Sequence, residues 1–183
     1  MGPRRQRRGQ DEHQGGDTSG AYQPQPAPSM GTPYEQLIPF CGQCANRSKL
    51  YQLYIQPDNF SAVAERLYVG PISSNVFVRA ATSHHLRKAA FEELKKTTPN
   101  VVEEDILRDG KEALYALSTL LGSDQWFFDA ESPALFDASV FAYTHLLLDE
   151  GMEWKENGLG NFLNEFLNLL QHRERIFGRF FQR

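Results

Sequence analysis

Two cysteines are the first residues of this chain that could carry chemistry. Cys41 and Cys44 form the motif CGQC, and a CxxC at the start of a helix lowers the pKa of its first thiol and makes a redox centre. That chemistry requires a βαβ context before the motif and a cis-proline loop after it. The preceding stretch reads YEQLIPF and is interrupted by Pro39. We therefore treat the pair as a redox candidate without its usual context.

Metal binding is a second use of the same thiols. A structural zinc site takes four ligands, and this chain has two cysteines in all, which make half of such a site. His84 and His85 are adjacent, and on a helix they would diverge by roughly 100°, so both cannot face one metal ion. The sequence shows no Ser/His/Asp grouping and no phosphate-binding glycine loop. We expect no metal, no other cofactor and no enzymatic activity.

The C-terminal end combines arginines with aromatic side chains. Cations near a helix C-terminus complement the helix dipole, which is a purely structural role. Arginine and aromatic residues are also typical of interface anchors, and a basic amphipathic segment can lie on anionic lipid. The residues that we predict as candidates for partner docking are Arg173, Arg175, Phe177, Arg179, Phe180 and Phe181.

One carboxylate, Asp137, lies in a run that is otherwise almost entirely apolar, ESPALFDASVFAYTHLLLDEG. A helix that is apolar on all sides belongs in the middle of a bundle. Pro133 suits the first helical turn, which places Asp137 near the helix start, where a carboxylate can accept hydrogen bonds from free backbone N–H groups. Burying it without a partner would cost several kcal/mol. We interpret Asp137 as a structural helix cap, together with Pro133 and Ser132.

Helical periodicity predicts the elements that hold these residues. Apolar positions recur at helical spacing, and Gly122 and Gly151 provide stops. No convincing β-alternation occurs from residue 83 onward, so we predict an all-α bundle. The predicted helices cover residues 58–70, 83–96, 100–121, 133–150 and 161–181.

The N-terminal region has a different composition. Residues 1–33 are rich in Gly, Gln, Pro and Ser and cannot bury enough apolar surface to offset the entropy of ordering. Residues 34–50 give no clear pattern. We predict that residues 1–50 form a disordered or poorly ordered tail and that residues 51–183 form the domain.

Charge and hydropathy exclude several functions. Residues 1–50 carry six basic and four acidic side chains, and the formal charge of the chain is −4, so residues 51–183 carry −6. An acidic domain repels phosphate backbones, and we expect no nucleic-acid partner. No stretch approaches the roughly 20 apolar residues of a membrane-spanning helix, and no secretory signal is evident. Two cysteines without a signal favour a reducing compartment such as the cytosol.

The residues around Asp137 resemble the C-terminal helical domain of the glutathione-transferase superfamily. In that superfamily a Pro-(Ser/Thr)-x-x-Asp motif caps the buried core helix, and Pro133 and Asp137 match it. Ala134 stands where the hydroxyl residue belongs. This departure removes one cap acceptor, a loss on the order of 1 kcal/mol, for which Ser132 could substitute.

Two longer stretches resemble metaxins and their fungal relatives in the mitochondrial sorting and assembly machinery. These are LYIQPDNFSAVAERLYVG and LSTLLGSDQWFFDAESPALFDASVFAYTHLLLD, within a resemblance that covers about residues 50–180. The resemblance implies a non-enzymatic subunit, peripheral on the cytosolic face of the mitochondrial outer membrane, that assists import and insertion of β-barrel precursors. Its implied partners are those precursors, the outer-membrane β-barrel assembly subunits and the other subunits of the machinery.

A complete relative would carry an N-terminal thioredoxin-like half, which residues 1–50 cannot supply. We therefore expect a glutathione-transferase C-terminal-like helical bundle with the thioredoxin-like half absent, as in a truncated product or a variant with a replaced N-terminus. The glutathione-binding and catalytic positions of transferases lie in the absent half. Two alternatives remain open: a divergent transferase or thiol-redox protein that uses Cys41, and a generic helical interaction module.

Overall fold

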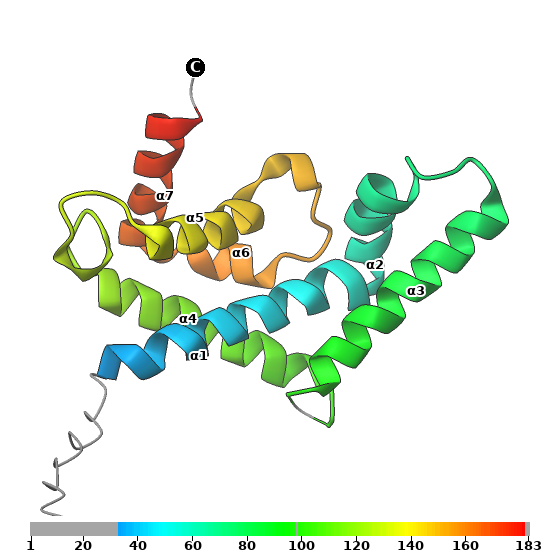
Figure 1. Cartoon of the computed structure of the whole chain (residues 1–183), viewed down its shortest axis with the longest axis horizontal. Helices are drawn as coiled ribbons and strands as arrows, with labels where there is room; N and C mark the ends of the chain where they lie inside the picture. Colours follow the sequence, from blue (N-terminus) through cyan, green and yellow to red (C-terminus); the bar gives the residue numbers. More distant parts are fainter. Residues whose placement is uncertain (1–32, 98, 182–183) are drawn as a thin grey trace, which may run out of the picture. The chain divides into compact units, whose positions relative to one another are not determined.

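The computed structural model describes residues 33–97 and 99–181, and within these ranges all regular structure is helical (Figure 1). The α-helices are α1 (Pro33–Leu50), α2 (Pro57–Asn59), α3 (Val76–Lys95), α4 (Glu103–Leu121), α5 (Leu135–Leu148), α6 (Gly158–Leu163) and α7 (Leu167–Phe180). Two π-helical segments, η1 (Tyr51–Ile55) and η2 (Phe60–Val69), and two short 3₁₀ turns, η3 (Phe127–Asp129) and η4 (Glu150–Met152), complete the described elements. The predicted all-α class is confirmed.

Helix α1 corrects the predicted tail. We expected residues 1–50 to be poorly ordered, but residues 33–50 form a helix that packs mainly against α4. The helix continues through Pro39, although a proline there removes one backbone hydrogen bond. Side chains that are buried after Pro39 offset that loss, and they belong to Cys41, Cys44 and Ser48. The rest of the predicted tail, residues 1–32, lies outside the described residues.

Close approach of three helices depends on Gly110 in α4. A Cβ atom at this position would lie 2.9 Å from a Leu159 methyl group on α6 and 3.1 Å from Ser48 Cβ on α1. Real Cβ atoms do not approach other heavy atoms as closely as the first of these distances. The missing side chain therefore lets α1 and α6 pack tightly against α4, around a core that includes Leu114, Leu121, Phe127, Leu147 and Leu163.

Helix α4 follows the sequence prediction closely. Its N-terminus lies at Glu103 rather than at residue 100, and Val102 occupies the N-cap without a side-chain hydrogen bond. Three acids in the first turn face the positive end of the dipole instead. The helix ends at the predicted glycine, Gly122, whose φ of 55° favours glycine.

The C-terminal segment is broken into two helices rather than one. Asn168 causes α7 to begin where it does: its amide nitrogen donates to the carbonyls of Ser118 (2.8 Å) and Gly122 (3.0 Å) at the end of α4. Its amide oxygen accepts from the Ser118 hydroxyl at 2.8 Å. These bonds fix the start of α7 against α4, and Leu167, the first residue of α7, is exposed.

A helical extension formed by η2 and α3 leaves the core after α1 and returns to α4 (Figure 1). Asn59 ties its base to the loop before α6, because its side chain accepts from the backbone N–H groups of Lys155 and Glu156 at 2.9 and 3.0 Å. Helix α3 begins at Val76, earlier than predicted, where Asn75 provides the cap. Within the described residues, no helix combines the length and apolarity that crossing a membrane requires.

Candidate functional site: an apolar groove between two helices

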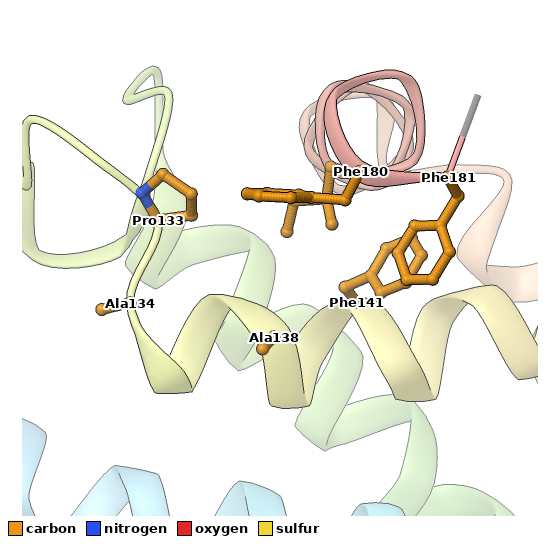
Figure 2. Close-up of a pocket in the computed structure, with 7 residues that line it drawn as sticks. Pro133, Ala134, Ala138, Phe141, Phe180 and Phe181 are labelled. Atoms are coloured by element: carbon orange, nitrogen blue, oxygen red, sulfur yellow. The ribbon is translucent and has the colours of Figure 1, made fainter. Parts of the chain in front are cut away.

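An open groove of about 350 Å³ lies between the start of α5 and the end of α7 (Figure 2). It is lined by Pro133, Ala134, Ala138, Phe141, Ile176, Phe180 and Phe181. Every one of these residues is apolar, so the groove offers contact area without side-chain hydrogen-bonding groups. We refer to it as the α5–α7 groove.

Small side chains on one helix and large ones on the other shape this groove. Ala134 is the N-cap residue of α5 and Ala138 lies in the first turns of the helix, and both line the groove on the same face of the helix start. Figure 2 shows Phe180 reaching from the end of α7 across the space above this face, and Phe181 lying beside Phe141. The rings of Phe141 and Phe181 stack, with centroids 5.2 Å apart. The alanines leave the groove open, and the phenylalanines form its wall.

Four stacked rings hold the end of α7 on α5. The His145 ring lies 5.1 Å from Phe141 and 5.4 Å from Phe177, measured between centroids. Phe177 in turn stacks on Phe181 at 6.0 Å. Aromatic pairs of this kind stabilise a fold by more than their buried area alone would. The wall of the groove is therefore held in place by packing between α5 and the end of α7.

The six predicted docking residues divide into two groups. Arg173 pairs with Glu174 and lies over the Phe177 ring. Arg175 donates to the Gln125 carbonyl at 2.9 Å, and burial lowers the pKa of its guanidinium. These two arginines and Phe177 therefore pack within the fold. The members that face solvent are Arg179, Phe180 and Phe181.

Asp137 fixes the first turn of α5 beside the groove. Its Oδ2 accepts from the Ala134 N–H at 2.9 Å, and its Oδ1 accepts from the Phe127 N–H at 3.0 Å. His172 Nε2 on α7 lies 2.9 Å from the same Oδ1, and both side chains are fully buried. The carboxylate thus joins the loop before α5, α5 itself and α7. The sequence prediction named the capping carboxylate but not its histidine partner.

The other two predicted cap residues take different positions. Ala134 occupies the N-cap, and its methyl group cannot accept a hydrogen bond. Pro133 therefore precedes the helix instead of lying in its first turn. Ser132 is exposed and does not substitute at the N-cap. In place of an N-cap side chain, the Asp137 carboxylate at the start of α5 accepts hydrogen bonds from two backbone N–H groups.

The environment of His172 favours its neutral form. Burial lowers the pKa of its imidazole, and the bond to Asp137 raises that pKa by a smaller amount. The neutral ring therefore donates from Nε2 to the carboxylate, while edge-to-face contacts with Trp126 and Phe127 surround it. The hydrogen bond between His172 and Asp137 links α7 to α5 in the interior, and it depends on the charge state of the ring. We call this pair the buried joint.

The two cysteines lie in the interior of α1 and away from its N-terminus. Burial, followed by the neighbouring Cys44, raises the pKa of the Cys41 thiol to about 11. Burial also raises the pKa of Cys44, with Asp109 as the next cause. Since the thiolate is the reactive form, neither cysteine has the environment of an activated nucleophile.

A second groove, of about 450 Å³, lies between α1 and α5. It is lined by Gly42, Ala45, Asn46, Lys49, Ser139, Ala142, Tyr143 and Leu146. Its lining includes charged and amide side chains, unlike that of the α5–α7 groove. Among the described residues, no three His, Cys, Asp or Glu side chains are grouped as metal ligands would be.

Comparison with known families supports the superfamily resemblance. Residues 110–176 match the family model described as glutathione S-transferase, C-terminal domain. The matched segment runs from α4 into α7 and contains Asp137, His172 and most of the α5–α7 groove. No curated protein matches the chain. The chain thus carries a glutathione S-transferase C-terminal-like domain, built entirely of helices in its described part.

Proposed function

We propose that this chain, with its transferase-like helical domain, is a non-enzymatic subunit of the mitochondrial outer-membrane sorting and assembly machinery. It acts peripherally on the cytosolic face and assists the import and insertion of β-barrel precursors. Its partners are the precursors, the β-barrel assembly subunits and the other subunits of the machinery. The metaxin-like stretches over residues 53–70 and 117–149 support this proposal.

The observation that carries the proposal is the α5–α7 groove. Strands of membrane β-barrels alternate apolar and polar side chains, so one face of an extended precursor segment presents a row of apolar groups. An open and fully apolar groove fits such a face. Arg179 lies over the ring of the groove residue Phe180, with its guanidinium carbon 5.4 Å from the ring centroid, and can contact polar groups on the segment. Binding through an apolar cleft with a polar edge is a recurring mode of peptide recognition.

The thiol-redox alternative has less support from the geometry. It needs an activated thiolate, whereas burial holds the Cys41 pKa at about 11. The alternative of a generic interaction module would use the same groove for another partner. The two groove-based functions therefore differ in ligand and not in site, and a binding experiment with defined peptides separates them.

The test is fluorescence anisotropy of the purified full chain with labelled peptides that tile the strands of an outer-membrane β-barrel precursor. Ala138→Leu places a larger side chain in the α5–α7 groove, and Ala142→Leu makes the same change one turn later, in the second groove. We expect Ala138→Leu to weaken binding at least tenfold and Ala142→Leu to leave it unchanged. Circular dichroism and urea unfolding show whether both variants are folded.

Scrambled peptides of identical composition are the control for the precursor itself. Tighter binding of the native strand order supports a precursor receptor. Equal binding of native and scrambled peptides overturns the receptor function in favour of a generic apolar site. Absence of binding by the unmodified chain, or equal losses in the two leucine variants, overturns the role of this groove.

A further inference from the structure

Residues 67–78, with the sequence LYVGPISSNVFV, comprise the end of η2, the turn that follows it and the start of α3, and they contain no charged side chain. We call this stretch the apolar turn. Arg66 precedes it and Arg79 follows it directly. Six of the fifteen large apolar side chains that are exposed in the described structure lie in these twelve residues. They are Leu67, Tyr68, Ile72, Val76, Phe77 and Val78.

The exposure is greatest at the tip and in the first turn of α3. Phe77 is 86% exposed, Val76 is 72% exposed and Ile72 is 61% exposed. Figure 1 shows the loop at the end of α3 that is far from α4, with no other labelled helix beside it. Neither groove described above is lined by these residues. The apolar turn is a projection and not a cleft.

Several backbone N–H groups of the apolar turn find hydrogen-bond partners close by in the chain. Asn75 caps α3: its Oδ1 accepts from the Phe77 N–H at 2.9 Å, and its carbonyl accepts from the Arg79 N–H at 3.0 Å. The Ser73 hydroxyl accepts from the Asn75 N–H at 3.0 Å. Within the turn, the N–H groups of Ile72, Asn75, Phe77 and Val78 have acceptors, and the Gly70 N–H donates to the Glu65 carbonyl just before it.

Internal satisfaction of this kind is what a lipid environment demands, because hydrocarbon offers no partner to a backbone N–H group. The polar side chains of the turn are uncharged. Those of Ser73, Ser74 and Asn75 are small, and the amphipathic ring of Tyr68 suits a membrane interface. The guanidinium groups of the two flanking arginines already bind protein groups, and that of Arg66 also donates to the Gly151 carbonyl at 2.8 Å. Both are paired with acids, Arg66 with Glu153 and Arg79 with Glu65, so the surroundings of the turn are close to neutral.

We propose that the apolar turn is a membrane anchor that inserts Ile72, Val76 and Phe77 into the interface of a lipid bilayer. Lipid fits these observations better than a protein partner does, because the surface is a convex and charge-free tip in which several backbone N–H groups are already bonded. The anchor rests on the turn alone and not on the proposed function. It can fail while the groove binds precursors, and the groove can fail while the turn binds lipid.

The near-neutral surroundings define the kind of membrane binding. Insertion driven by apolar side chains does not require anionic lipid and is largely insensitive to salt, whereas attraction of a basic segment depends on both. We therefore expect weak, reversible partition of the full chain into vesicles of pure phosphatidylcholine. The affinity changes less than threefold between 50 and 500 mM NaCl.

Vesicle flotation of the purified full chain tests this anchor. Phe77→Asp places a charge at the tip, and Leu135→Asp is a matched control, because Leu135 is 84% exposed and also lies in a first helical turn. We expect Phe77→Asp to weaken partition at least tenfold and Leu135→Asp to leave it within twofold. Failure of the unmodified chain to float, or equal losses in the two variants, overturns the anchor.

A second variant reports insertion directly. Phe77→Trp adds an indole at the tip, and its emission is compared with that of the unmodified chain, which retains Trp126 and Trp154. Vesicles of brominated phosphatidylcholine should quench the added emission and shift it to shorter wavelength. Absence of added quenching, or recovery of a protein and no lipid by a photocrosslinker at position 77 on isolated mitochondria, overturns the anchor in favour of a protein-docking tip.

Discussion

The hydroxyl oxygens of Ser48 on α1 and Tyr143 on α5 lie 3.0 Å apart in a buried contact. Ser48 donates to the Cys44 carbonyl at 2.9 Å, so the phenol donates to Ser48. Burial raises the pKa of Tyr143 to about 12, which keeps this donor protonated. A polar bond thus links a helix that we predicted as tail to the central helix of the domain.

Replacing Tyr143 with Phe tests this bond. The change removes one hydrogen bond but leaves Ser48 its backbone acceptors, so we expect a loss of about 1 kcal/mol in the free energy of unfolding. Urea unfolding followed by circular dichroism measures it. Ser48→Ala should cost more, about 1–3 kcal/mol, because the buried phenol then has no partner. Equal stability of both variants and the unmodified chain would contradict the coupling of α1 to α5.

Deleting α1 tests whether the fold needs it. A chain that begins at residue 51 loses the helix that covers α4, together with the buried Cys41, Cys44 and Ser48. We expect this chain to lose its sharp urea transition and its near-ultraviolet circular dichroism, as in a loosely packed state. The full chain is the reference. A cooperative transition at an unchanged urea midpoint would restore the predicted tail boundary at residue 50.

Removing the carboxylate of Asp137 should be the most destabilising of the single changes considered. Asp137→Ala leaves two backbone N–H groups and the His172 ring without their buried acceptor, with an expected cost of about 3–5 kcal/mol, because each unsatisfied buried donor costs about 1–3 kcal/mol. Asp149→Ala is the matched control, because Asp149 also caps a turn, accepting from the Gly151 N–H, but does so at the surface. That change should cost about 1 kcal/mol. Chemical denaturation of both variants decides, and similar losses would contradict the buried joint.

The buried histidine predicts a pH dependence of stability. Since burial lowers the folded-state pKa of His172 below its usual value of about 6.5, the unfolded chain binds a proton more readily than the folded chain. The contribution of His172 is therefore complete above pH 6.5 and is lost as the pH falls toward the folded-state pKa. Unfolding free energies at pH 7.5 and 5.5 should differ less in His172→Gln, which keeps a donor for Asp137. An identical pH dependence in that variant would exclude His172 as its source.

Thiol reactivity separates a structural cysteine pair from a redox centre. With a pKa of about 11, roughly one thousandth of Cys41 is ionised at pH 8. We expect both thiols of the folded chain to react with an aromatic disulfide reagent at least a hundredfold more slowly than they do in urea. Fast stoichiometric reaction of one thiol in the folded chain would revive the redox alternative.

Sequence patterns predicted those parts of the fold that use large apolar residues. The periodicity of α4, its stop at Gly122 and the apolar run of α5 were all sufficient to locate helices. Helix α1 was not predicted, because it buries small thiol and hydroxyl side chains, and a search for apolar periodicity does not detect them. The break between α6 and α7 was not predicted, because the start of α7 is bonded to α4 through Asn168, a contact between residues about 50 positions apart in the sequence.

The candidate site was partly predictable for a similar reason. Phe180 and Phe181 stood out as aromatic residues next to arginines. Nothing in the sequence indicated that Ala134, noted only as a departure from the capping motif, and Ala138 would leave a groove open. Arg173 and Arg175 appeared equivalent to Arg179 in the sequence, yet two of the three pack within the fold. The pairing of His172 with Asp137 depends on the folded arrangement of α5 and α7.

The central claim, membership of the outer-membrane sorting and assembly machinery, is tested most directly by co-purification. The full chain is tagged, mitochondria are solubilised gently, and the proteins recovered with it are identified by mass spectrometry. We predict recovery of the outer-membrane β-barrel assembly subunits, with a loss of bound precursor in Ala138→Leu and not in Ala142→Leu. Recovery of cytosolic or translation components without those subunits would contradict the proposed function.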